Sequence, residues 1–365
     1  MSRNYFYKMK SIIGLLVIFI VLSFGSCKNI TQNIIPDKNK SLEFSTKKAI
    51  KIFKLSSLVK KTILIPLSTT DTNLIGQIKR IKFNNNSIYI LDSDQSKSLS
   101  RFSMDGNLIS IYHKEGKGPN EYIRPYDFDF ASGKGDLTIL ADADKLIHLN
   151  IDLLPINDTW LKFRSFHFIY HKNRIYHQSD TSDGELKISN FSGKLLSNFF
   201  SQDNHGNFYS GNPFSRYQDE AFFIRFNCDT IYKIIGNRPL PYRTILDNQY
   251  GSLHAYWQSN YYEVFNFTSN LLIYNKSTRS INCIGKHTND DILNTSVNVL
   301  HFFNLYNDQL VGLIEPVDLL KSNSQLSFAK NVSWPNDSLF SLISITSNPI
   351  IFIIYLKLND DTKNI

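Results

Sequence analysis

Short apolar stretches separated by tight polar turns recur along most of this chain. Each unit has an apolar strand, a turn rich in Asn, Asp, Gly or Lys, and a second strand rich in Ile, Tyr and Leu, which is typical of a β-hairpin. Such turns fall at residues 84–86, 134–136, 172–174, 227–229, 269–270 and 307–308. Their spacing averages about 45 residues, the period of propeller blades and too long for leucine-rich or helical-pair repeats. The pattern predicts an all-β fold, a six-bladed β-propeller.

The first two units also resemble each other in detail. Residues 90–94 read Ile-Leu-Asp-Ser-Asp and residues 140–144 read Leu-Ala-Asp-Ala-Asp, so the two segments lie 50 residues apart. Strand-like segments at residues 62–67 and 350–356 are candidates to share one blade and so close the ring. A β-sandwich with irregular insertions is the alternative architecture on turn spacing alone.

The N-terminus carries a different pattern, an apolar run over residues 12–24 that follows Arg3, Lys8 and Lys10. About 13 apolar residues are too few to span a bilayer, so the run is typical of a signal peptide. The segment Phe-Gly-Ser-Cys at 24–27 resembles a lipobox, which predicts cleavage before Cys27 and acylation, palmitate included, of its thiol. An ordinary free cysteine beside a conventional cleavage site is the alternative. The expected parts are a signal peptide (1–26), a lipidated polar tether (27–46) and the propeller (47–365).

The net charge limits the kinds of binding partner that we expect, and the cysteine content limits the disulfides. The net charge of +8 loses three positive charges with the signal peptide, and the remaining basic residues are scattered apart from several near the anchor. They fit an anionic membrane surface, and without a nucleic-acid motif no nucleic-acid partner is expected. The residue after Cys27 is Lys28, whereas an aspartate at this position is associated with retention in the inner membrane. We therefore expect the protein to be anchored in the outer membrane, and the sequence does not decide between its periplasmic and its surface face. Cys228 and Cys283 do not make a disulfide framework; we expect buried thiols, with one bridge as the alternative.

Several segments together resemble a known family, and the most specific is Gly-Lys-Gly-Pro-Asn-Glu-Tyr at residues 116–122. The others are residues 74–78, 88–92, 102, 105–106, 229–232 and 348–350. The chain resembles the six-bladed β-propeller lipoproteins, related to NHL-repeat propellers, of gut-type Gram-negative anaerobes. The resemblance implies a fold and an envelope location, and no activity. Asn120 replaces a glycine usual in that family, and asparagine tolerates the left-handed conformation such a turn needs.

The candidate binding residues gather in the first two units. Loops of equivalent position in successive blades open on one face of a propeller, so we expect one cluster at a rim. Its members are Asp92, Asp94, Glu121, Tyr122, Arg124, Asp142 and Asp144. The aspartates could hold a hard cation such as Ca²⁺ or act as an acid and base pair. Alternatively they cap turns by accepting backbone N–H groups, and Glu121 and Tyr122 only tie neighbouring blades together.

The other chemical patterns in the sequence give weaker indications of a function than the rim candidates do. The sequence contains no nucleophile elbow, zinc-protease motif, phosphate loop or dinucleotide fingerprint, and no catalytic or metal-binding residues are assigned. His167, His171 and His177 are expected to be ordinary strand histidines. The aromatic stretch at 250–262 is either an exposed platform for a sugar or partner, or a packed insertion.

The expected function is therefore non-catalytic, a membrane-tethered binding platform for a protein or glycan partner at the cell envelope. The alternative is a lyase or hydrolase of glycans or lactones with its site in the central funnel. Because propellers serve both purposes, fold alone does not choose between them.

Overall fold

The computed structural model describes residues 42–45, 55–131, 135–201, 211–225, 228–246, 248, 250–285, 301–306, 308–321, 332–333, 335, 338 and 341–357. Cys27 and the predicted signal peptide lie outside these residues. Within them, no helix is both long enough and apolar enough to cross a membrane. Short helical segments flank the last blade: η2 (Leu55–Leu58) and α2 (Pro316–Lys321).

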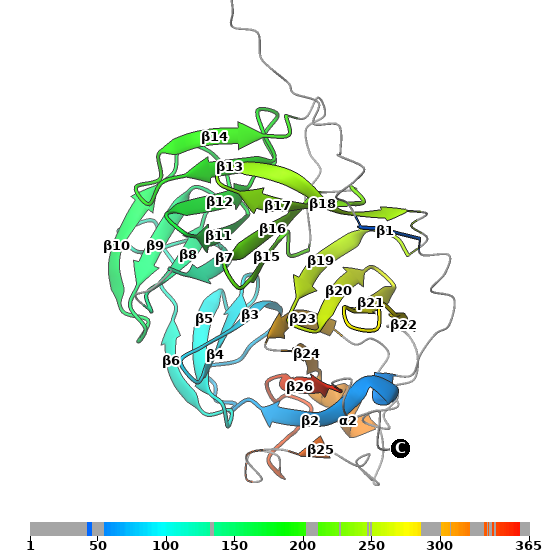
Figure 1. Ribbon diagram of the computed structural model, residues 1–365. Helices are drawn as coiled ribbons and strands as arrows, with labels where there is room; N and C mark the ends of the chain where they lie inside the picture. Colours follow the sequence, from blue (N-terminus) through cyan, green and yellow to red (C-terminus); the bar gives the residue numbers. More distant parts are fainter. Residues whose placement is uncertain are drawn as a thin grey trace, which may run out of the picture. The chain divides into compact units, whose positions relative to one another are not determined.

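The described strands form six sheets arranged in a ring, and we number these blades along the chain (Figure 1). Blade 1 contains β3 (Ile78–Asn84), β4 (Ser87–Asp92), β5 (Ser98–Ser103) and β6 (Leu108–Tyr112). Blade 2 contains β7 (Pro125–Phe130), β8 (Leu137–Ala141), β9 (Lys145–Leu149) and β10 (Pro155–Trp160). Blade 3 contains β11 (His167–His171), β12 (Arg174–Gln178), β13 (Leu186–Ser189) and β14 (Leu195–Phe199). Blades 4 and 5 contain β15 (Phe214–Tyr217), β16 (Glu220–Ile224), β17 (Thr230–Ile235), β18 (Arg238–Leu246); and β19 (Leu253–Gln258), β20 (Tyr262–Phe267), β21 (Asn270–Asn275), β22 (Ile281–Gly285). Blade 6 contains β23 (His301–Tyr306), β24 (Gln309–Ile314), β26 (Ile350–Leu356), β2 (Val59–Pro66) and the short β25 (Val332–Ser333).

Both ends of the propeller meet in blade 6, which confirms the predicted ring closure. The N-terminal strand β2 pairs antiparallel with the C-terminal β26, in a register that places Ile63 opposite Ile353 and Leu64 opposite Phe352. The innermost strands β3, β7, β11, β15, β19 and β23 each contact the next one, and β23 contacts β3. The six-bladed propeller is therefore a closed ring.

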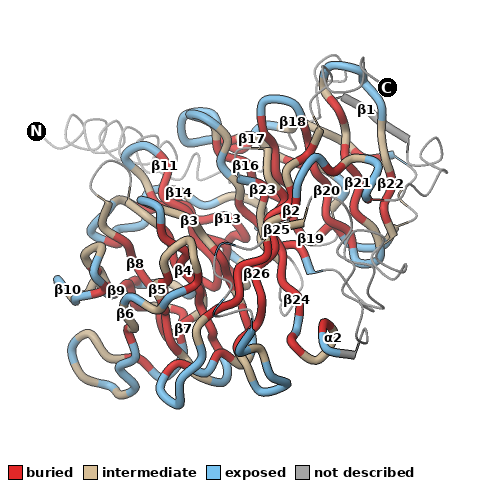
Figure 2. The backbone as a smooth tube through the Cα atoms, turned by 90° about the horizontal axis from the view of Figure 1, so that it is seen from below, coloured by how far each residue is buried: buried red, intermediate tan, exposed pale blue. Residues whose placement is uncertain are grey.

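Burial explains why the strands have different sequence patterns. All residues of the second strands β4 and β8 are buried, because a neighbouring blade covers each face, and both strands are nearly continuous apolar runs. The outer strand β10 is mostly exposed or half-buried. Apolar clusters fill each of the six interfaces between successive blades; in one of them Leu91 and Leu99 of blade 1 pack with Phe128 and Ile139 of blade 2. Figure 2 shows the burial concentrated in the strands, with exposed loops around them.

Two details of the predicted organisation need correction. Four of the predicted turns join the first and second strands of a blade, but those at 227–229 and 269–270 join the second and third strands of blades 4 and 5. The corresponding first turns lie at Gln218–Asp219 and at residues 259–261, where the sequence is less conspicuously turn-like. The average spacing survives because the first and last turns are correct.

The second correction concerns the expected tether. Within residues 27–46, β1 (Leu42–Ser45) pairs in parallel with β18 and adds a fifth strand to blade 4. The described strands of the propeller therefore include Leu42–Ser45, which precedes the predicted start at Lys47. The outer edge of β18 has unpaired backbone groups that a short extended segment can satisfy, so a polar composition did not exclude a strand. Cys228 and Cys283 are both free; Cys283 is buried, as expected, but Cys228 is partly exposed.

Candidate functional site

The aspartates predicted at the rim have a repeated structural role. Asp92 is 1% exposed, and its Oδ1 accepts the backbone N–H groups of Asp94 and Gln95, both at 3.0 Å. Its Oδ2 accepts those of Gly76 (2.8 Å), Gln77 and Ser96. Burial alone would raise the pKa of Asp92, but these N–H donors together lower it below its usual value. Asp92 thus caps its own turn and ties the strand entry of blade 1 to that turn.

Asp142 ties the entry of the first strand of blade 2 to a turn in the same way. Its Oδ1 accepts the N–H groups of Ile123 (3.0 Å) and Arg124 (2.9 Å), which lead into β7 as Gly76 and Gln77 lead into β3. Asp142 itself has a left-handed backbone with φ of 51°. The 50-residue sequence repeat therefore encodes the same anchor for the first strands of blades 1 and 2.

Hydrogen bonds within the loop at residues 116–122 and to neighbouring segments hold this loop in place. The Glu121 carboxylate accepts the N–H of Gly118 at 2.8 Å, and a Cβ at Gly116 would lie 2.1 Å from Glu121 Oε2, which explains the glycine. Tyr122 is fully buried and donates its hydroxyl hydrogen bond to Lys97 O at 2.6 Å. Asn120 has φ of 55°, so the left-handed turn expected from the asparagine is confirmed. Tyr122 has no exposed surface to offer a ligand in this conformation.

The remaining candidates keep some exposure. Asp94 forms an ion pair with Arg124 that joins blade 1 to the entry of blade 2, and both side chains are substantially exposed. Asp144 is half-buried, and burial together with the nearby Asp142 carboxylate raises its pKa. The seven candidates lie around one stretch of the blade 1–2 rim, and binding there stays a prediction. Among the described residues, no group of three or more His, Cys, Asp or Glu side chains is arranged to hold a metal ion.

A second set of charged residues occupies the innermost strands of three successive blades. Asp127 on β7 accepts from Nε of Arg80 on β3 at 2.9 Å and from the backbone N–H of Phe168 on β11. His167 Nδ1 lies 2.7 Å from Nη2 of Arg80, and because arginine only donates, this nitrogen accepts and the ring proton is on Nε2. Burial and the Arg80 charge lower the pKa of His167 to about 4, so it is neutral at pH 7.

The same arrangement recurs one step along β7. Asp129 accepts from Lys82 of blade 1 (2.8 Å) and from Arg216 of blade 4 (2.7 Å), and also from the N–H of Tyr170. Asp127, Asp129 and His167 are all at most 2% exposed. Burial would raise the pKa of Asp127, but the Arg80 charge holds it well below its usual range. These two carboxylates are therefore paired and inaccessible, and they join blades together.

The other two histidines singled out in the sequence, His171 and His177, lie on different strands of blade 3. His171 lies on β11, whereas His177 pairs in register with Phe168 on the opposite face of the sheet from His167. His177 is buried between the hydroxyl groups of Ser165 and Ser189. The strand assignment of all three residues is confirmed.

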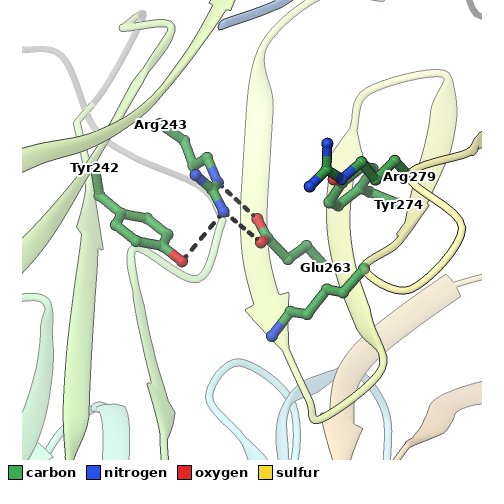
Figure 3. A pocket seen from close by; sticks show the side chains of 6 residues that line it. Tyr242, Arg243, Glu263, Tyr274 and Arg279 are labelled. Carbon is green, nitrogen blue, oxygen red and sulfur yellow. Dashed lines mark hydrogen bonds and ion pairs between the residues drawn. The ribbon is translucent and has the colours of Figure 1, made fainter. Parts of the chain in front are cut away.

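An open pocket lies between blades 4 and 5, with a volume of about 470 Å³ (Figure 3). It is lined by Tyr242, Arg243, Glu263, Tyr274, Lys276 and Arg279. Arg243 on β18 makes a two-pronged ion pair with Glu263 on β20, with Nη2–Oε1 at 2.7 Å and Nε–Oε2 at 3.0 Å. Tyr256 donates a further hydrogen bond to Glu263. Burial lowers the pKa of Arg243, but Glu263 more than reverses this and the net shift is upward.

Aromatic residues of the 250–262 stretch belong to the cores on both sides of blade 5. Tyr256, Trp257 and Tyr262 are 2–4% exposed and belong to the cores between blades, so the exposed-platform interpretation is wrong for them. They alternate along two paired strands whose faces are both covered, which is why the stretch is rich in aromatic residues. Tyr261 alone of the predicted tyrosines there is exposed, at 39%.

Sequence reasoning missed the pocket. Its residues come from an outer strand of one blade and from two strands and a turn of the next, and none of them forms a local motif. The one available signal was the concentration of basic residues at Lys276 and Arg279 in the turn after β21.

The fold and its cavities place the chain among six-bladed β-propellers. The pattern of the family described as a domain of unknown function, DUF4934, matches residues 41–355, so the chain belongs to that family. Its fold is similar to that of a proposed exported protein of Bacteroides fragilis, with 16% identity, a TM-score of 0.72, and coverage of 87% of this chain and 99% of the other. A member of the DUF4221 family from Bacteroides vulgatus is 9% identical, with a TM-score of 0.47 and coverage of 82% and 97%. No curated protein matches the chain.

Proposed function

We propose that this protein is a lipid-anchored, non-catalytic propeller of the bacterial envelope that binds a protein or glycan partner. The observation that carries the proposal is the pocket between blades 4 and 5, which is open and bears two cations, Lys276 and Arg279, besides the paired Arg243. Concave sites with a few convergent polar groups and aromatic rings are typical of ligand-binding pockets.

The geometry of the funnel favours binding over catalysis. A lyase or hydrolase acting there would need an acid or base that reaches its substrate. Asp127, Asp129 and His167 are buried, and each is held by a cation or a backbone group of a neighbouring blade. They act as links between blades, with no face left for a substrate.

The envelope location rests on the N-terminal sequence. A basic start, a short apolar run and the lipobox-like segment before Cys27 support export and acylation. Similarity of fold to a proposed exported protein agrees with this location. We place the anchor in the outer membrane, and protease shaving of intact cells distinguishes its surface from its periplasmic face.

Acylation is tested by Cys27→Ala. Without the thiol there is no acceptor for the diacylglycerol group, so we expect labelled fatty acid incorporation to fall to background and the precursor to accumulate. Unchanged labelling in Cys27→Ala would refute the anchor, while Cys228→Ala serves as the matched cysteine control.

Binding is tested with the purified full-length lipoprotein immobilised in detergent and exposed to envelope extract and to a glycan array. We expect a partner retained by wild type and by Asp94→Ala/Arg124→Ala, but lost in a pocket variant, Arg279→Asn. Loss in the rim variant alone would move the site to blades 1 and 2. Products released from the array glycans by wild type would instead establish an enzyme.

A further inference from the structure

The charges around the pocket between blades 4 and 5 do not balance. Glu263 is 1% exposed, and Arg243 pairs with it through both carboxylate oxygens, so this pair contributes no net charge. Lys276 and Arg279 remain as two positive charges lining the cavity (Figure 3). An anion entering the pocket would find complementary charge that no pocket carboxylate already neutralises.

Lys276 is held in position with donor capacity to spare. Its Nζ donates to Gln258 Oε1 at 2.9 Å and to the Ser259 carbonyl, and its ammonium lies 4.6 Å from the centre of the Tyr217 ring. An ammonium group has three donors, so one remains for a ligand. Burial lowers the pKa of Lys276 and the nearby Glu263 partly offsets this. The lysine is thus a fixed donor at the pocket wall.

Arg279 occupies a backbone position that does not favour arginine. It lies in the turn between β21 and β22 with φ of 57°, where glycine or asparagine is less strained. Its side chain is exposed, and it forms no ion pair with any residue that the structure describes. Arg279 is thus an exposed cation whose charge is available to a ligand of the pocket.

The other lining residues indicate the kind of anion. Tyr242 and Tyr274 line the pocket and are both half-buried. The Arg243 guanidinium lies over the Tyr242 ring, 4.4 Å from its centre, so Tyr274 is the ring that we assign to contact with a ligand. A cavity of about 470 Å³ is in the range of small-molecule sites. Tyrosine rings next to cations suit a sugar ring that carries a carboxylate, because the ring's C–H face packs on the aromatic group while the acid meets Arg279 and Lys276.

We propose that this pocket binds an acidic saccharide through the carboxylate of a uronic acid unit, with Arg279 and Lys276 as its anion contacts. The inference rests on the proposed binding function and specifies its ligand class. A bare inorganic anion would make no use of the tyrosines.

The test is calorimetry of the purified full-length protein with trigalacturonic acid, its fully methylated ester, hexaglutamate and sulfate. We expect binding of the free acid, little binding of the ester, and weakening by about 10- to 100-fold in Arg279→Asn, as for loss of a hydrogen bond to a charged group. Asparagine suits the left-handed backbone, so this variant should fold at least as well as wild type.

Lys172→Asn is the matched control. Lys172 is exposed in the turn after β11 with φ of 53°, so the substitution removes the same charge from the same kind of backbone position far along the ring. Unchanged affinity in Lys172→Asn together with loss in Arg279→Asn supports the pocket. Equal loss in both variants would reveal only long-range electrostatics and overturn the inference.

The remaining outcomes distinguish a failure of the acidic-saccharide pocket from a failure of the proposed binding function. Binding of ester and acid alike, or of hexaglutamate or sulfate as tightly as the acid, overturns the acidic-saccharide assignment. If Arg279→Asn still retains an envelope partner, the binding platform stands and the pocket is wrong. If wild type binds neither a partner nor any array glycan, the proposed function itself fails.

Discussion

The rim of blades 1 and 2 and the pocket between blades 4 and 5 both collect charged side chains, yet they use them differently. At the rim, the carboxylates of Asp92 and Asp142 accept hydrogen bonds from backbone N–H groups, and Asp94 and Arg124 form an ion pair. In the pocket, the one lining carboxylate, Glu263, pairs with Arg243, and neither Lys276 nor Arg279 forms an ion pair with a residue that the structure describes. The difference shows that charge alone does not mark a site. What matters is whether the fold has already satisfied the charge.

Repetition is the second difference between the two regions. Asp92 and Asp142 hold equivalent positions in blades 1 and 2, and each ties the first strand of its blade to a turn, which is a structural role. The ion pair of Arg243 and Glu263 joins blades 4 and 5, and it is not part of the sequence repeat that blades 1 and 2 share. A repeated polar group is therefore better evidence of a structural role, and an unrepeated one of a specific function.

The largest effect should follow removal of the most buried rim carboxylate. In Asp92→Ala, at least two partly buried N–H groups lose their acceptor, so we expect a loss of about 3 kcal/mol or more in the free energy of unfolding. Asp142→Ala should cost about 1–2 kcal/mol, because this carboxylate is less buried and accepts from fewer groups. Urea denaturation at pH 7 measures both. A cost below 1 kcal/mol in Asp92→Ala would contradict its anchoring role.

Acid should reproduce part of this effect. The folded pKa of Asp92 is depressed relative to its value in the unfolded chain, so its stabilisation is complete above pH 4 and is lost as pH falls through the folded pKa. Asp127, with the same direction of shift, contributes in the same window. We expect the melting temperature of wild type to fall steeply below about pH 4, and that of Asp92→Asn to fall less. Parallel curves would show that Asp92 is not a source of the acid sensitivity.

The smallest effect is expected for the exposed pair at the rim. Asp94 and Arg124 are both substantially exposed, so Arg124→Ala should change the free energy of unfolding by at most about 1 kcal/mol. Its uronate affinity in calorimetry should equal that of wild type, since the residue belongs to blades 1 and 2. A reduced affinity would extend the site to the rim and erase the distinction between the two regions.

Several features of this protein could be determined from the sequence because they depend on local or periodic patterns. The turn spacing predicted six blades, and the apolar segments at residues 62–67 and 350–356 predicted the shared blade, since unpaired strands at both ends of a ring must meet. The fit of Asn120 to a left-handed turn was also readable, because backbone preference is a property of single residues.

Tertiary structure alone decided which charged residues meet. Arg80, Asp127 and His167 lie on three different blades, and nothing in their local sequences shows that they would neutralise one another. Likewise Arg243 finds Glu263 because β18 and β20 face each other across a blade interface, leaving Lys276 and Arg279 without a carboxylate. Such meetings depend on how closely blades pack and on their mutual angle. Those quantities arise from the sum of many apolar contacts, so no short pattern in the sequence records them.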